Sequence, residues 1–250
     1  MLFYATMKLT RKSIPYPEGV PSMIIYDKSG NELQEIQSPT LSEAQLEQAR
    51  LLNANLKEAD LFKANLFRAD LNGAVLFRAD LEKADLREAM VEGADLRKAD
   101  LDSAALQGSS FRGSNLKGAN LHAAKMTIAD FRKTNLQGAD LHEAHMDNVR
   151  MAEADLFKAN LEKAELWGAD LISANLSCAN LHGANLKGAD LRGANLEKAD
   201  LRYADLQGAS MQKANLQGAK LEGAILKGTF MKGADLRGAD LFGAIGKFIY

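Results

Sequence analysis

Histidine, cysteine and carboxylate side chains are the groups in this sequence that could support chemistry. His122 and His142 are separated by twenty residues, and His145 follows three residues after the second of them. Two imidazoles brought ~5 Å apart by neighbouring coils or strands can hold a metal ion. No cysteine lies near them in the sequence, and a solvated histidine ladder is the commoner outcome. We therefore expect a solvated ladder and no metal, with a metal site at His122 and His142 as the weaker alternative.

Catalytic motifs are not found among the remaining polar residues. Cys178 lies at an outward position of the repeat, and the pattern around it does not favour a reactive thiol. Aspartate and asparagine recur so regularly that paired carboxylates arise from repetition alone, and hydrogen bonding near turns is their expected role. The glycines never form the GxGxxG or GxxxxGK[ST] patterns that cradle phosphates. We expect neither enzymatic activity nor a cofactor.

A five-residue repeat must position all of these side chains. Leucine or another large apolar residue occupies every fifth position from Leu41 to Leu241, with a small residue, mostly alanine, two positions earlier. On an α-helix a five-residue step advances about 500°, so the leucines would spiral around every face. In an extended chain each leucine and its alanine point to one side. Glycine, common two residues after the leucine, suits a turn whose third residue has positive φ.

Departures from leucine indicate how many sides close one coil. Six of the eight are separated by multiples of twenty residues: Val91, Phe111, Phe131, Met151, Met211 and Met231. The other two, Met126 and Met146, are also twenty residues apart. Residues stacked in one core column should vary together in size, because protein interiors are close-packed. The pattern predicts a coil of twenty residues with four sides of five.

Motifs such as Ala59-Asp60-Leu61-Phe62-Lys63 and Ala189-Asp190-Leu191-Arg192-Gly193 resemble the pentapeptide-repeat family, whose pattern is A(D/N)LXX. The resemblance implies an all-β fold, a right-handed quadrilateral parallel β-helix. Its length would be about ten coils, or roughly 48 Å. We expect an N-terminal leader or cap over residues 1–40, the β-helix over 41–245 and a C-terminal tail over 246–250.

The N-terminal leader contains signals of its own. Residues 22–26 and 32–36 flank a turn-forming segment, which predicts a β-hairpin. Thr40 and Glu43 match a capping box, which predicts a short helix from Leu41 to Leu52 before the coils begin.

Apolar residues at outward positions mark candidate interaction surfaces. Phe62, Phe67 and Phe77 follow the leader, which either folds over them as a cap or leaves them to a partner. Trp167 is a single outward aromatic residue. At the other end the apolar outward residues are Ile225, Phe230, Phe242 and Ile245. There the tail covers the last coil, or two rods meet end to end as a homodimer.

Charge separates two hypotheses for the function. The formal net charge is −2, but the side containing Leu61, Leu81 and Leu101 carries −7. The resemblance implies one specific role, because the quinolone-resistance members mimic duplex DNA and engage gyrase or topoisomerase. Duplex DNA would carry roughly 28 charges over 48 Å, so this side falls short. The first hypothesis is therefore a rigid, non-enzymatic protein-interaction scaffold, and the alternative is a DNA mimic directed at topoisomerase.

The remaining expectations concern partners and location. The partner would be a protein of unknown identity, with no direct contact to nucleic acid. No apolar run approaches the ~20 residues that span a bilayer. The single cysteine and the absence of a signal-peptide pattern at the N-terminus predict a cytoplasmic protein.

Overall fold

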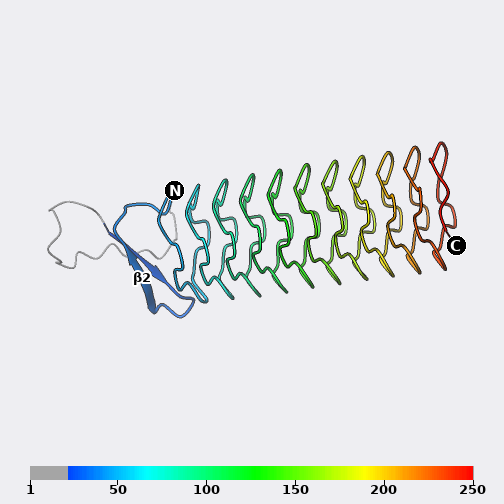
Figure 1. The fold of residues 1–250 in the computed structure, drawn as a ribbon. Helices are drawn as coiled ribbons and strands as arrows, with labels where there is room; N and C mark the ends of the chain where they lie inside the picture. Colours follow the sequence, from blue (N-terminus) through cyan, green and yellow to red (C-terminus); the bar gives the residue numbers. More distant parts are fainter. Residues whose placement is uncertain (1–21, 250) are drawn as a thin grey trace, which may run out of the picture.

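The computed structural model describes residues 22–249 as a rod of stacked coils with a β-hairpin at its N-terminal end (Figure 1). The hairpin consists of strands β1 (Met23–Tyr26) and β2 (Glu32–Ile36), which pair antiparallel. The Asp27 carboxylate holds the turn, because it accepts hydrogen bonds from the backbone N–H groups of Ser29 and Asn31, each at 2.8 Å.

Backbone hydrogen bonds at twenty-residue spacing join each coil to the next. The N–H of Leu61 donates to the carbonyl of Asp80 at 2.7 Å, and the N–H of Asp80 donates to the carbonyl of Ala59 at 2.9 Å. Parallel bridges with the same spacing run from Gln45–Asn65 to Ile225–Ile245. The predicted parallel β-helix, with four pentapeptides in each coil, is confirmed. Its right-handedness and its number of coils stay predictions.

Each corner of the coil is a turn with positive φ at its third residue. The N–H of Ala64, for example, donates to the carbonyl of Leu61 at 2.9 Å, and Lys63 between them has φ 52°. Glycine fills this position in many repeats, because it adopts positive φ without steric cost. Long polar residues adopt the same φ in most of the others. Ile128 does so too, with φ 59°, although a β-branched residue is an outlier there.

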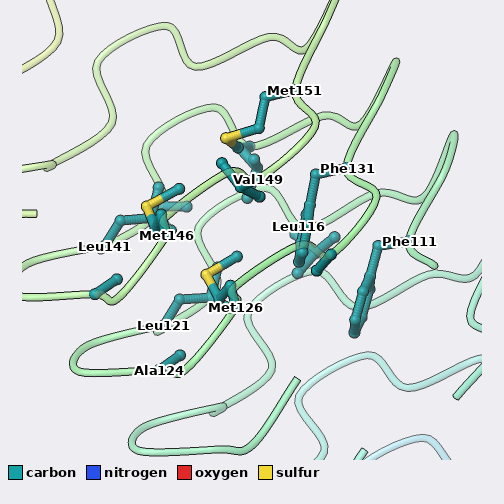
Figure 2. Close-up of a cluster of buried hydrophobic side chains, with 14 of the residues drawn as sticks. Phe111, Leu116, Leu121, Ala124, Met126, Phe131, Leu141, Met146, Val149 and Met151 are labelled. Carbon is teal, nitrogen blue, oxygen red and sulfur yellow. The ribbon is translucent and has the colours of Figure 1, made fainter. Parts of the chain in front are cut away.

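The core is built from columns of identical or matched side chains. The leucines and alanines at the inward positions of the repeat, from Leu41 to Leu226, are buried. In Figure 2 the ring of Phe111 lies against that of Phe131 one coil later, and Met126 lies beside Met146. The predicted twenty-residue columns are confirmed by these contacts.

Four hydroxyl residues replace alanine inside the tube: Ser109, Ser114, Thr134 and Thr229. Each donates its hydroxyl hydrogen to a backbone carbonyl, for example from Thr134 to Phe111 at 2.9 Å and from Thr229 to Leu206 at 2.8 Å. A buried hydroxyl is tolerated when it is hydrogen-bonded, so these exceptions do not interrupt the core.

The short helix predicted over Leu41–Leu52 is wrong, because these residues already form coil turns. The N–H of Leu46 donates to the carbonyl of Asn65 at 2.7 Å, and Glu43 of the expected capping box has φ 57°. Helix would carry Leu41, Leu46 and Leu51 around different faces, whereas the coil buries all three. Pairing with the next coil therefore overrides the local capping signal.

The hairpin is attached to the first coil by backbone pairing and by apolar contact. Asp27 forms an antiparallel bridge with Ala54, and the N–H of Asn55 donates to the carbonyl of Tyr26 at 2.8 Å. Ile24 and Ile25 of β1 are buried, and Ile25 joins the core. The hairpin thus covers part of the N-terminal end and occupies one stretch of exposed strand edge.

The C-terminal residues continue the ladder with one residue removed. Phe230 pairs with Ile249, a spacing of nineteen, after Gly246 with φ 95°. Phe248 turns toward the core and is half-buried against it. Leu236 and Leu241 in the last coil are only half-buried, so the apolar interior is less covered here than along the rod.

Candidate functional site

His122 and His142 lie on neighbouring coils of one side of the rod. We call this side, formed by the pentapeptides around Leu101, Leu121, Leu141 and every twentieth residue before and after them, the acidic side. The two imidazole rings stack with 5.6 Å between centroids and an interplanar angle of 16°. Both rings are half-buried at the start of a turn. The structure therefore brings together the two histidines that the sequence singled out.

Carboxylates approach both histidines. Oδ1 of Asp102 lies 3.3 Å from Nδ1 of His122, and Oε1 of Glu143 lies 3.4 Å from Nε2 of His142. The possible ligand atoms of His122, His142 and Glu143 all lie within 4.8 Å of one another. Sequence reasoning missed the two carboxylates as neighbours, although Asp102 precedes His122 by the same twenty residues.

The other two histidines have different surroundings. His182 lies in the same column as His142 but two coils further along, where its ring meets Tyr203 edge to face at 5.4 Å. His145 lies on the adjoining side and bridges the backbones of Lys125 and Glu165. The sequence grouping of His145 with His142 therefore does not place them in one cluster.

Phe62, Phe67 and Phe77 lie on three different sides of the rod, because successive pentapeptides turn a corner. They do not form one patch. Each ring is half-buried beneath a cation: Lys63 at 4.9 Å from the centroid of Phe62, Arg68 at 4.7 Å from Phe67, and Arg78 at 5.4 Å from Phe77. The expected cover by leader residues 1–21 lies outside the described residues.

Trp167 is exposed, and the structure adds Ile128 on the same side of the rod, two coils earlier. Their side chains are 52% and 61% exposed, respectively. Asn148 lies on the coil between them, and its N–H donates to the carbonyl of Trp167 at 2.8 Å. We call Ile128 and Trp167 the apolar wall patch. Ile128 was not singled out from the sequence. The available signal was a β-branched residue at the turn position that glycine often occupies.

The C-terminal end carries the remaining apolar residues expected at a surface. Phe242, Ile245 and Phe230 are exposed, Phe242 by 77%, whereas Ile225 is half-buried. Ile249 is exposed beside them and was not singled out from the sequence. Together with the half-covered last coil, these residues form an apolar C-terminal end.

Much of the surface charge is compensated within single pentapeptides. Where aspartate precedes and arginine follows the buried residue, the two side chains pair, as Asp200 and Arg202 do with Nε to Oδ1 at 2.8 Å. The hydrogen bonds from Arg202 lower the pKa of Asp200, against the opposing effect of burial. At Asp130 burial alone would raise the pKa, but Arg132 and the nearby Arg150 hold it below its usual range.

Comparison with known proteins agrees with this architecture. A family model described as pentapeptide repeats (8 copies) matches the chain in overlapping segments that together cover residues 41–245. The chain belongs to the pentapeptide-repeat family. No curated protein gave a significant match. Among residues 22–249 of this pentapeptide-repeat protein, no helix is long and apolar enough to cross a bilayer.

Several solved pentapeptide-repeat structures are similar. HetL from the cyanobacterium Nostoc, a protein involved in heterocyst differentiation regulation, is 37% identical, with 81% of this chain and 89% of HetL covered and a TM-score of 0.45. QnrB1, a plasmid-mediated fluoroquinolone resistance protein, is 20% identical, with 68% and 86% covered and a TM-score of 0.44. Rfr23 from the cyanobacterium Cyanothece is 25% identical, with 54% and 90% covered and a TM-score of 0.24.

Proposed function

We propose that this pentapeptide-repeat protein is a rigid, non-enzymatic scaffold that binds a cytoplasmic protein partner through its outer walls. The observation that carries the proposal is the apolar wall patch, where Ile128 and Trp167 stand exposed on a surface of mostly polar residues. Exposed tryptophan is enriched at binding hot spots, and an apolar group on a polar wall is a typical anchor. The continuous backbone ladder beneath the patch keeps its geometry fixed before binding.

The test is a cross-linked pull-down from the native host that compares three forms of the full chain. The wild type should retain a specific partner, and a variant carrying Ile128→Asn and Trp167→Ser should lose it. The matched control is Tyr203→Ser, which removes an aromatic residue of similar exposure from the acidic side. A partner retained equally by all three forms would contradict a role for the patch.

The acidic side supports a second candidate, in which the protein mimics DNA and engages gyrase or topoisomerase. Asp100, Asp102, Asp140 and Glu143 are concentrated along this side, which carries −7 in total. A gyrase supercoiling assay titrated with the protein tests it directly. Inhibition or protection at micromolar levels that weakens in an Asp100→Asn, Asp140→Asn variant supports mimicry, and no effect at those levels removes it.

We also propose that two chains associate through the apolar C-terminal end. The exposed Phe242 and Ile245 beside a half-covered last coil support a self-complementary contact. Analytical ultracentrifugation should show a dimer that Phe242→Ser shifts to monomer. A monomer at all accessible concentrations, or a dimer that Phe242→Ser leaves intact, would disprove association through this end.

A further inference from the structure

We propose that His122, His142 and Glu143 form a divalent transition-metal site on the acidic side of the rod. This site is independent of the apolar wall patch, which lies on a different side. The three residues offer two imidazole nitrogens and one carboxylate oxygen, a donor set that zinc accepts at sites with an open coordination position.

The separation of the donor atoms suits one shared ion after small side-chain rotations. The three atoms lie within 4.8 Å of one another. An ion equidistant from three atoms at that separation would be about 2.8 Å from each, and Zn–N bonds are about 2.0–2.1 Å. Each donor therefore has to move by less than about an ångström, which rotation of the two half-buried imidazoles and of the exposed Glu143 side chain provides.

The backbone fixes the spacing, so binding does not have to assemble the site. The N–H of Ala123, directly after His122, donates to the carbonyl of His142 at 3.0 Å. The backbone N–H groups of the two histidines are held by the side chains of Asn120 and Asp140, each at 3.1 Å. With both turns fixed in this way, only side-chain freedom is lost when an ion binds.

Asp102 can orient the first ligand. Its Oδ1 lies 3.3 Å from Nδ1 of His122. A carboxylate that accepts a hydrogen bond from Nδ1–H selects the tautomer whose Nε2 carries the free lone pair, an arrangement common among metal-binding histidines. Asp102 therefore acts as a positioning residue for His122.

Electrostatics favours a cation at this place. The net charge of −7 on the acidic side attracts divalent ions. Asp140 lies in the same pentapeptide as His142, and Asp100 lies on the coil before that of His122. Lys163 has its Nζ 3.7 Å from Glu143 Oε1, and its side chain is about half exposed, so it can move away without burying a charge. Imidazole ligands favour zinc, copper and nickel over magnesium and calcium.

The test is isothermal titration calorimetry of the tag-free full chain with zinc chloride and with nickel sulfate. We expect one ion per chain for the wild type and at least a tenfold loss of affinity in His142→Gln and in Glu143→Gln. The matched control is His182→Gln, which removes a histidine of the same column that has no histidine on a neighbouring coil and should leave binding unchanged. Thermal melts without metal verify that each variant folds as the wild type does.

Three results would overturn the proposal. The first is no saturable zinc or nickel binding by the wild type up to millimolar ion. The second is an equal affinity in His142→Gln, and the third is an equal loss in His182→Gln. Magnesium chloride provides a further comparison, because magnesium binding as tight as that of zinc would indicate diffuse attraction to the acidic side without histidine ligands.

Discussion

The rings of Phe111 and Phe131, twenty residues apart in sequence, stack with 4.7 Å between centroids and an interplanar angle of 11°. Both side chains are fully buried, in a column that also contains Val91 and Met151. Their contact shows how the tube accommodates a larger residue, because a flat ring on one coil is matched by a flat ring on the next. Replacing only one of them leaves the other without its matched neighbour.

We therefore expect Phe111→Leu and Phe131→Leu to be coupled. Each single change should destabilise the protein, and the double variant should lose about 0.5–1.5 kcal/mol less than the sum, because the stacking contact can be lost only once. Urea unfolding measures the free energies. The losses of unfolding free energy caused by Phe111→Leu and by the distant Met211→Leu should be additive. An equal departure from additivity in the two pairs of substitutions would show that the ring stacking is not the cause of the coupling.

Ile128 should be a site of strain. A β-branched residue with φ 59° is disfavoured, and its exposed side chain gains little from packing. Ile128→Asn should raise stability by about 1 kcal/mol, because asparagine adopts this region more readily. Ile128→Val, still β-branched, serves as the control and should not stabilise. A loss of thermal stability in Ile128→Asn would show that the isoleucine is held by contacts that outweigh the strain.

Thr134 should contribute through its hydroxyl group. The buried hydroxyl donates to the carbonyl of Phe111 at 2.9 Å. Thr134→Val keeps the shape but leaves that carbonyl with one partner fewer, so it should cost about 1 kcal/mol in unfolding free energy. Thr127→Val, at an outward position, should change stability by less than about 0.5 kcal/mol. Equal effects of the two variants would indicate that the hydrogen bond adds nothing.

The pairing of Asp200 with Arg202 should make part of the stability depend on pH. Because the pKa of Asp200 is lowered in the folded protein, its contribution is present above the unfolded carboxyl pKa of about 3.9 and is lost as the pH falls through the folded value. Arg202→Gln should lower the melting temperature by about a degree or two at pH 6, and this difference should shrink as the pH falls below about 3.9.

Arg112→Gln is the matched control for this pH dependence, because Ser110 stands where the other pentapeptide has aspartate. The difference in melting temperature between Arg112→Gln and the wild type should not depend on the titration of a paired carboxylate. A difference between wild type and Arg202→Gln that stays constant from pH 6 to pH 2 would contradict the pairing argument.

Gly246 should control the docking of the last residues. It has φ 95°, and a Cβ there would lie 2.9 Å from the backbone of Lys227. Gly246→Ala should therefore displace Phe248 and Ile249, which increases hydrogen exchange at these two amides and lowers stability. Gly188 also has a positive φ, but a Cβ there would meet open space. Gly188→Ala should therefore lower stability only because alanine is strained at positive φ. An unchanged exchange rate in Gly246→Ala would argue against the clash.

Periodicity in the sequence predicted the fold well because one physical constraint recurs in every coil. The shared twenty-residue spacing of Phe111 with Phe131 and of Met126 with Met146 predicts the core columns from the sequence alone. The local signal at Thr40–Glu43 was misleading, because a capping motif says nothing about the coil that pairs with Leu46 and its neighbours. Non-local pairing decided that segment.

The candidate sites were predicted less completely. The histidine stack followed from the period, but the approach of Glu143 depends on side-chain rotamers that no sequence pattern specifies. The separation of Phe62, Phe67 and Phe77 onto three sides could have been derived from the period. The spacing of nineteen residues between Phe230 and Ile249 could not have been derived in this way, because nothing in the residue types shows which position of the repeat the chain omits.

The uninterrupted frame makes the rod a modular object whose length and surface pattern can be changed separately. Inserting twenty residues of the repeat after Gly188 would add one coil and leave every later residue on its original side, because each coil contacts only its neighbours. Inserting five residues at the same place would rotate all later side chains by one quarter of the circumference. Surface groups such as Trp167 and Phe242 could thus be realigned relative to each other without altering a single buried contact type.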